Sequence, residues 1–191
     1  MSTKRIRHSI DRAKYLKLIT HVKSDVDLKE HNRIKLLRIF GVLYYTGIRL
    51  NEIHHINIGK LRELIAEQGG VIYTSKKDKE RKLFFSDTAC KELTKLIKHE
   101  TNPLAQIASS WNKQTTAMHP ISLINSVNKY MQKVLGAGHT SHSFRQGILS
   151  EMFESHVDTG TCRDFIGHAD ATTTLKYKVS TDNHIRSSLV R

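Results

Sequence analysis

The sequence is poor in cysteine and has no long apolar run. Only two of its 191 residues are cysteines, Cys90 and Cys162, and they stand far apart within apolar helical patterns. Two such cysteines do not make a disulfide framework, so we expect them to be small core residues in a reducing compartment. A run of about 18 apolar residues and a signal-peptide pattern are both absent, which argues against a membrane-spanning or secreted protein and favours a cytoplasmic one.

Acidic residues are scarce relative to basic ones. The 31 Lys and Arg residues against 18 Asp and Glu residues leave a formal net charge of +13. Because such an excess repels itself, it usually indicates a polyanionic partner. Nucleic acid is the first candidate, with a nucleoid-associated location, since the charge is spread through segments that look folded. A membrane-surface role would require a basic amphipathic helix, and none stands out in the sequence. The alternative to a nucleic-acid partner is a merely soluble basic protein.

Apolar spacing predicts one α-rich mixed α+β domain with a single small β-hairpin. Residues 36–45 are apolar almost all round, which predicts a helix in the middle of the domain. Residues 99–119 are weakly patterned and allow either a short helix or a surface loop. The expected helices are 10–22 after a Ser9 cap, 27–45 after a capping box of Asp27 and Glu30, and 87–98 after Ser86 or Asp87. Three more follow: 121–135 with Ile124, Val127, Met131 and Val134 inward, 141–155, and a short helix that starts at Asp158 or Thr159 and runs through Ile166, stopped by Gly167.

The segment 46–53, Thr-Gly-Ile-Arg-Leu-Asn-Glu-Ile, joins two of these helical regions. Gly47 permits a sharp, left-handed turn, and a new helix is expected near Leu50. Arg49 would then lie at a junction between buried helices, where a lone charge is costly, and Glu52 could hold it as an ion pair. A plain helix-end salt bridge is the alternative interpretation.

Two β-rich runs, at residues 71–75 and 81–85, flank a charged turn at residues 76–80. This arrangement predicts a β-hairpin with lysines at its tip. An ammonium group on a flexible tip can reach a phosphate or a sugar oxygen. The alternative is a solvated hairpin end without a function.

The last fifty residues hold the densest group of candidate chemical residues. Ser-His-Ser-Phe-Arg at 141–145 places His142 and Arg145 on one face of a first helical turn. An imidazole beside a fork-shaped guanidinium suits a phosphate in its transition state better than a carbonyl. His168 follows in Ile-Gly-His, and Tyr177 stands nine residues later. Singly, these residues have ordinary explanations: a helix cap, a buried histidine and a tyrosine at the edge of the core.

In this order and at these distances, the motifs resemble the catalytic domain of the tyrosine recombinase (phage integrase) family. The motifs are Thr-Gly-Ile-Arg, the lysine-tipped hairpin, the His-x-x-Arg box, Gly-His and the tyrosine. Each is weak alone, but together they make a strong signal. The resemblance implies the tyrosine recombinase catalytic fold for residues 9–179, between a basic arm at 1–8 and a tail at 180–191.

The resemblance also implies a role for each matched residue. Arg49 and Arg145 would clamp the non-bridging oxygens of the scissile phosphate, with Glu52 as the acidic residue that follows the first arginine. Lys76 would protonate the departing 5′-oxygen, or Lys77 would do so if the turn slips by one residue.

His142, His168 and Tyr177 complete the implied set. Tyr177 would be the nucleophile, and because a phenol with a pKa of about 10 is protonated at neutral pH, it needs a base, for which His142 is the best candidate. His168 would hydrogen-bond the phosphate. The product is a 3′-phosphotyrosyl link that a 5′-hydroxyl can attack without ATP, so no cofactor is expected. The other histidines lack metal-ligand spacing, so no metal is expected either.

The implied function is a site-specific DNA recombinase that integrates, excises or inverts DNA. Its partners would be a double-stranded recombination site, accessory DNA-bending proteins and further copies of the chain, which would form a tetramer on DNA and a monomer or weak dimer when free. Family members usually carry an additional N-terminal DNA-binding domain, so we expect either the catalytic part of a longer integrase or a naturally short recombinase. Ile185 and Leu189, on one stripe of the tail, are expected to dock on a neighbouring subunit.

Two other functions stay open at this point. A type IB topoisomerase-like enzyme would use the same chemistry but rejoin the same strand. A non-catalytic DNA-binding relic would act as a regulator, although a relic is free to lose the tyrosine or an arginine, and this sequence keeps the whole set.

Overall fold

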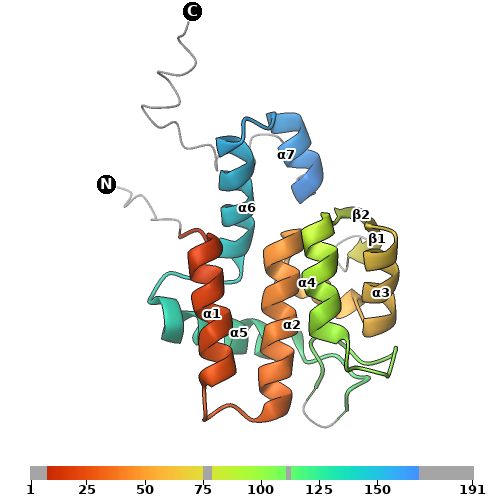
Figure 1. The fold of residues 1–191 in the computed structure, drawn as a ribbon, viewed down its shortest axis with the longest axis vertical. Helices are drawn as coiled ribbons and strands as arrows, with labels where there is room; N and C mark the ends of the chain where they lie inside the picture. Colours follow the sequence, from red (N-terminus) through yellow and green to blue (C-terminus); the bar gives the residue numbers. More distant parts are fainter. Residues whose placement is uncertain (1–7, 75–78, 111–112, 168–191) are drawn as a thin grey trace, which may run out of the picture.

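A computed structural model of the protein describes residues 8–74, 79–110 and 113–167. As the apolar spacing predicted, this part of the chain is a helix-rich domain with one antiparallel hairpin (Figure 1). Its elements in chain order are α1 (Arg12–Ser24), α2 (Glu30–Thr46), the 3₁₀ helix η1 (Leu50–His55), α3 (Ile58–Ala66), β1 (Gly69–Thr74), β2 (Lys79–Phe84), α4 (Asp87–Ile97), α5 (Pro120–Leu135), α6 (His142–Glu154) and α7 (Thr159–Ile166).

Helix α2 is the centre of the domain, as its apolar sequence predicted. Ile39, Phe40 and Leu43 are fully buried, and α1 and α4 pack on either side of the helix (Figure 1). Gly41 lets α4 approach closely, because a Cβ at this position would overlap the side chain of Leu96. Helix α2 is therefore packed between neighbouring helices, and the Arg49 segment follows directly after its C-terminal end.

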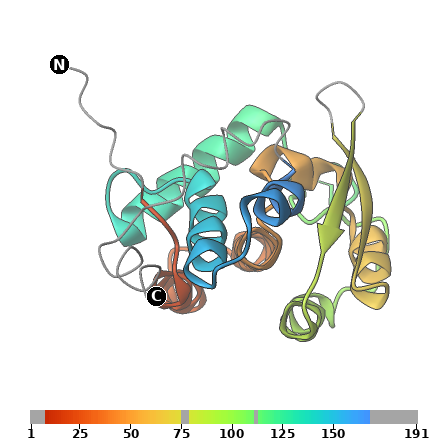
Figure 2. The same ribbon diagram turned by 90° about the horizontal axis from the view of Figure 1, so that it is seen from above.

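The hairpin and α5 lie on opposite sides of the axis formed by α2 (Figure 2). In the hairpin, β1 pairs antiparallel with β2 in a register that sets Ile72 opposite Arg81 and Gly70 opposite Leu83. The side chains of Ile72, Arg81 and Leu83 face the interior. The predicted hairpin is confirmed, but both strands begin two residues earlier than predicted, so residues 79 and 80 belong to β2 and not to the turn. The tip at 75–78 lies outside the described residues.

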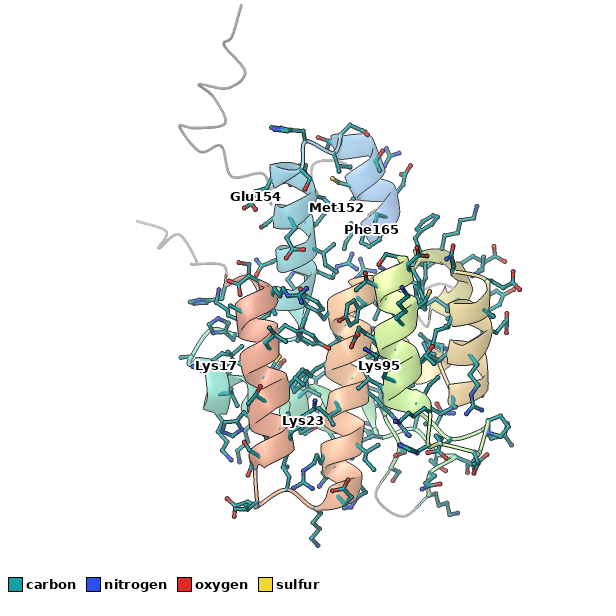
Figure 3. The ribbon with its side chains drawn as sticks, viewed as in Figure 1. Lys17, Lys23, Lys95, Met152, Glu154 and Phe165 are labelled. Atoms are coloured by element: carbon teal, nitrogen blue, oxygen red, sulfur yellow. The ribbon has the colours of Figure 1, made fainter. Side chains whose placement is uncertain are left out.

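Helices α6 and α7 form a small unit above the end of α2 (Figures 1 and 2). They share a second apolar cluster, and in Figure 3 Met152 of α6 lies between the two helices. Phe165 of α7 packs against Phe84 of β2, with ring centroids 6.5 Å apart. This unit therefore rests on both α2 and the hairpin.

Some helix starts follow the predicted capping residues and others do not. The Ser86 hydroxyl accepts the Ala89 N–H at 3.2 Å, and Asp158 caps α7 in the same way. Ser9 was the wrong cap for α1, because the Asp11 carboxylate accepts the Lys14 N–H at 2.8 Å.

The capping box predicted for α2 is also wrong. Helix α2 begins at Glu30 after Lys29, which makes no side-chain cap. The carboxylate of Asp27 is not used at this end, and its own N–H donates to Asp25 instead. Asp25 lies at the end of α1 and binds Tyr130 and Lys133 of α5, so this turn serves the contact between helices rather than the start of α2.

Two further predictions concern α5 and the segment before it. Ile124 was expected inside but is 36% exposed, because Leu123 takes the buried position. Residues 99–119 were predicted to form either a short helix or a surface loop. The described part of this segment contains no helix. It holds two isolated β-bridges, Asn57 to Gln106 and Ser109 to Ala117.

Among the described residues, no helix combines the length and apolar character needed to cross a bilayer. Cys162 is buried and Cys90 half-buried, and neither forms a disulfide. Both belong to apolar clusters, as the sequence predicted.

Candidate active site

The turn after α2 positions the first predicted site residue. Gly47 ends the helix in the left-handed conformation, with φ at +59°. This is the residue type that tolerates such a φ, and the turn redirects the chain into η1. Arg49 stands immediately before η1, and its side chain is 42% exposed. Part of its guanidinium can therefore meet a ligand at the surface.

Glu52 holds Arg49 through both its backbone and its side chain. The Glu52 carboxylate accepts the Arg49 N–H at 2.9 Å through Oε2 and the Arg49 Nη1 at 2.8 Å through Oε1. Glu52 is only 2% exposed. Burial raises its pKa, but the charge of Arg81 and the hydrogen bonds from Arg49 outweigh burial, so the pKa lies below its ordinary value. The predicted ion pair is confirmed, and it belongs to a buried carboxylate rather than to a solvated helix end.

Arg81 is a member of this site that the sequence analysis did not identify. It lies on β2, is 6% exposed, and its Nη1 forms an ion pair with Glu52 Oε2. Its Nη2 makes a longer contact of 3.4 Å to the Gly47 carbonyl oxygen. One sequence signal could have found it. Period-2 alternation with Leu83 and Phe85 places position 81 on the inward face of the strand, where an arginine is unusual.

Arg145 joins the site from the opposite end of the chain. It is 1% exposed, and its guanidinium donates to the Gly47 carbonyl at 2.7 Å and to the Ile166 carbonyl at 2.5 Å. These two carbonyls belong to the C-terminal ends of α2 and α7, where backbone oxygens lack helical partners and attract cations. Arg145 thus binds α6 to both helix ends, close to the segment that carries Arg49.

His142 occupies a different environment from Arg145. It is the first residue of α6 and is exposed, whereas Arg145, one turn later, is buried. The predicted spacing on one helix is therefore present, but the imidazole lies toward solvent and the guanidinium toward the interior.

Four predicted residues lie outside the described part of the chain: Lys76, Lys77, His168 and Tyr177. The structure describes the segments that lead to them. The hairpin strands that flank Lys76 and Lys77 include Arg81, which contacts Glu52. Gly167 precedes His168 in the sequence and ends α7 in the left-handed conformation, with φ at +65°.

The described residues of the site supply cations and hydrogen-bond donors. Three guanidinium groups, those of Arg49, Arg81 and Arg145, gather around one carboxylate and one backbone carbonyl. Among these three, Arg49 has the exposed side chain and can meet an anion directly, and the buried Arg81 and Arg145 add positive charge beside it. In the described ranges, no group of three His, Cys, Asp or Glu residues could hold a metal ion.

Tyrosine recombinases match most of this chain. It is 27% identical over 173 residues to a tyrosine recombinase XerA from Pyrococcus horikoshii, which covers 88% of this chain and 58% of that protein. It is 26% identical over 156 residues to a tyrosine recombinase XerC from Lactobacillus leichmannii, which covers 77% of this chain and 51% of that protein. The chain therefore spans only about half to three fifths of the length of these relatives.

Solved structures and a family profile match the same region. The XerA recombinase crystal structure superposes with a TM-score of 0.69 at 19% identity, over 96% of this chain and 64% of that one. The structure of XerH bound to its difH substrate superposes with a TM-score of 0.66 at 17% identity, over 98% of this chain and 55% of that one. At these identities the likeness shows the fold, which is that of tyrosine recombinase catalytic domains. The profile of the phage integrase family matches residues 8–184. The chain belongs to the phage integrase family.

Proposed function

We propose that this chain is the catalytic part of a site-specific DNA recombinase that cleaves and rejoins strands through a 3′-phosphotyrosyl intermediate. The observation that carries the proposal is the convergence of Arg145 with the Arg49–Glu52 pair. Arg145 binds the Gly47 carbonyl across 98 positions of sequence, two residues before Arg49. This contact supports one shared site for the two predicted arginines, with the strand that follows the lysine-bearing tip beside it.

The proposed reaction assigns each residue a step. The Tyr177 oxygen attacks the scissile phosphorus while His142 accepts the phenol proton, and a phosphotyrosyl bond forms as the bond to the 5′-oxygen breaks. Lys76 protonates that leaving oxygen, with Lys77 as the alternative donor. Arg49 and Arg145 stabilise the charge that builds up on the non-bridging oxygens.

The next steps concern the remaining histidine and the second strand. His168 donates a hydrogen bond to the phosphate. A 5′-hydroxyl from another strand then attacks the phosphotyrosyl link and releases Tyr177, so the reaction conserves bond energy without ATP.

Double-stranded DNA is the proposed partner. The net charge of +13 favours a polyanion, and fold relatives have been solved with DNA, including the Tn1549 transposon integrase with circular intermediate DNA. Strand exchange between two sites needs several active sites, so we propose a tetramer on DNA and a monomer or weak dimer when free. Ile185 and Leu189 of the tail would then dock on the neighbouring protomer. We further propose accessory DNA-bending proteins and a nucleoid-associated location.

The test uses nicked duplexes whose central sequence is randomised. A nick just beyond the cleaved phosphate lets the 5′-hydroxyl fragment leave, so the protein stays attached to the 3′ end. Wild-type protein should form an SDS-resistant adduct, Tyr177→Phe should form none, and sequencing the trapped DNA should give the site. No adduct with any sequence, together with retained DNA binding, would instead support a non-catalytic regulator.

A second assay separates the two enzymatic functions. Two differently labelled copies of the trapped site should exchange strands in the presence of a recombinase. A topoisomerase-like enzyme would relax supercoiled plasmid but leave both labels on their original strands.

A further inference from the structure

We propose that Arg81 is a positioning residue for the phosphate-binding arginines, acting through Glu52. The inference rests on the proposed function, because it assigns Arg81 a task in the same phosphoryl-transfer site. Arg81 is buried, and unlike Arg49 and Arg145 it is not one of the residues that the family resemblance assigns to the phosphate. We therefore assign it an effect through the groups that it touches, Glu52 and the Gly47 carbonyl.

The first argument concerns the division of the Glu52 carboxylate. One oxygen, Oε1, accepts the side chain of Arg49 at 2.8 Å. The other, Oε2, accepts the Arg49 backbone N–H at 2.9 Å and also pairs with Arg81. Arg81 therefore holds Oε2, the oxygen that accepts the Arg49 backbone N–H. Oε1 is left to bind and orient the Arg49 guanidinium. A carboxylate held on both sides presents Arg49 in one orientation.

The second argument concerns charge. An isolated Arg49–Glu52 pair would be neutral and would attract a phosphate weakly. With Arg81, two guanidinium groups share one carboxylate, so the cluster keeps one positive charge. Arg81 also supports the ionised form of Glu52, which is almost fully buried and would otherwise be costly to charge. Arg81 thus lets Glu52 orient Arg49 without cancelling its charge.

The third argument concerns the neighbouring segments. Arg81 Nη2 contacts the Gly47 carbonyl, the oxygen that also accepts Arg145. A Cβ added to Gly167 would lie 3.3 Å from Arg81 Nε, so the side chain of Arg81 lies directly beside the end of α7. Arg81 therefore contacts the α2 turn and the α7 end, and it connects both to the hairpin.

Stability alone does not explain this arrangement. A buried ion pair is often no more stabilising than apolar residues of the same size. In the described part of the chain, the buried Arg81 Nε has no hydrogen-bond acceptor, which is a cost rather than a gain. A position between Leu83 and the hairpin tip, opposite Ile72, would accept an apolar residue if packing were its only task.

The test compares Arg81→Lys with Lys82→Gln, a change at the next, exposed position of the same strand. Lysine keeps the charge but cannot reach Glu52 and Gly47 with a planar fork. We measure the dissociation constant for the trapped DNA site, the single-turnover rate of adduct formation at saturating DNA, and the urea unfolding midpoint.

A positioning role predicts that the rate of adduct formation falls while DNA affinity changes little. Arg81→Lys should bind DNA within about threefold of wild type and form adduct about 100-fold more slowly. Lys82→Gln should keep the wild-type rate. In a Glu52→Gln background, Arg81→Lys should add little further loss, because both changes remove the same constraint on Arg49.

Other results overturn the inference. A wild-type rate in folded Arg81→Lys, or rate losses that multiply fully with those of Glu52→Gln, would show that Arg81 does not act through Glu52. If Arg81→Lys unfolds, Arg81→Met in the same three assays decides: a well-folded Met variant with the wild-type rate refutes the role. A wild-type protein that forms no adduct while binding DNA refutes the proposed function first, which distinguishes the two failures.

Discussion

The Nη1 atom of Arg145 donates a 2.7 Å hydrogen bond to the carbonyl oxygen of Gly47. This bond joins α6 to the turn that presents Arg49, so the conformation of the turn and the place of Arg145 depend on each other. Gly47 is left-handed, and a Cβ there would lie 3.0 Å from Ile166 and 3.2 Å from Ile148. The turn therefore has little tolerance for a side chain.

We expect Gly47→Ala to lower the free energy of unfolding by about 1–3 kcal/mol, through backbone strain and crowding. It should also slow adduct formation at least about tenfold, because the turn carries Arg49. Gly136→Ala is the matched control: Gly136 also has a positive φ, +92°, but a Cβ there meets nothing within 4 Å. Urea denaturation and single-turnover assays check both. Equal effects of the two substitutions on the rate would contradict the argument.

Glu52 should make stability depend on pH in a defined direction. Its pKa in the folded protein lies below the ordinary value of 4.5, despite burial, because of Arg81 and Arg49. A carboxyl with a depressed pKa stabilises the fold above its ordinary pKa, and this contribution is lost as the pH falls through the folded value. Glu52→Gln leaves Arg81 buried without its counter-charge, so we expect a loss of about 3–5 kcal/mol at neutral pH.

The difference between wild type and Glu52→Gln should then shrink as the pH falls below 4.5. Urea denaturation at a series of pH values measures it. Glu63→Gln, which changes a 60% exposed partner of Lys60, should differ from wild type by less than about 1 kcal/mol throughout. If the loss of unfolding free energy in Glu52→Gln stays constant down to pH ~3, Glu52 is not an ionised carboxylate between Arg49 and Arg81.

The role of the hairpin lysine can be tested through the leaving group. If Lys76 protonates the departing 5′-oxygen, Lys76→Ala should slow cleavage by about 10²–10⁴-fold. A substrate with sulfur in place of that oxygen needs no proton on departure, so it should restore the rate of Lys76→Ala. It should not restore Arg145→Ala, which lacks a phosphate clamp instead. Rescue of Lys77→Ala in place of Lys76→Ala would assign the donor to Lys77.

Gly147 should be required for the N-terminal segment to pack on α6. A Cβ at this position would overlap the carbonyl oxygen of Ile10, whose N–H donates to Ser143 at 3.0 Å. We expect Gly147→Ala to destabilise the protein by about 2 kcal/mol or more, although alanine favours helices. Ser150→Ala on the same helix adds no atoms and should stay close to wild type. Thermal unfolding compares the two, and an unchanged Gly147→Ala would disprove the close approach.

Deletion of residues 183–191 should separate cleavage from assembly. If Ile185 and Leu189 dock on a neighbouring protomer, the shortened chain should bind a single site normally but form fewer synaptic complexes of paired sites. Gel filtration of the DNA complexes and strand-exchange yield measure this. Normal formation of synaptic complexes by the shortened chain would contradict the idea.

Local chemistry explains which features could be predicted. The cap at Ser86, one of two residues predicted there, the glycine stop at Gly167 and the burial of α2 each depend on neighbouring residues, and all three are confirmed. The Ser9 cap was wrong because Asp11 caps α1, and the Ile10 N–H donates to the Ser143 carbonyl of α6, a contact that no local pattern predicts. The motif order predicted the family and the pairing of Arg49 with Glu52, since three residues of spacing suffice for that contact.

The tertiary structure alone decided how the charges at the site are shared. Arg81 is 29 positions from Glu52, and Arg145 is 98 positions from Gly47, so no local pattern sets these contacts. They form because the hairpin and α6 pack on the same helix end, where a buried carboxylate and unpaired helical carbonyls require cations. The sequence thus determined which residue types are present and in what order. Packing determined that Glu52 is shared between two arginines, which leaves positive charge available for an anion.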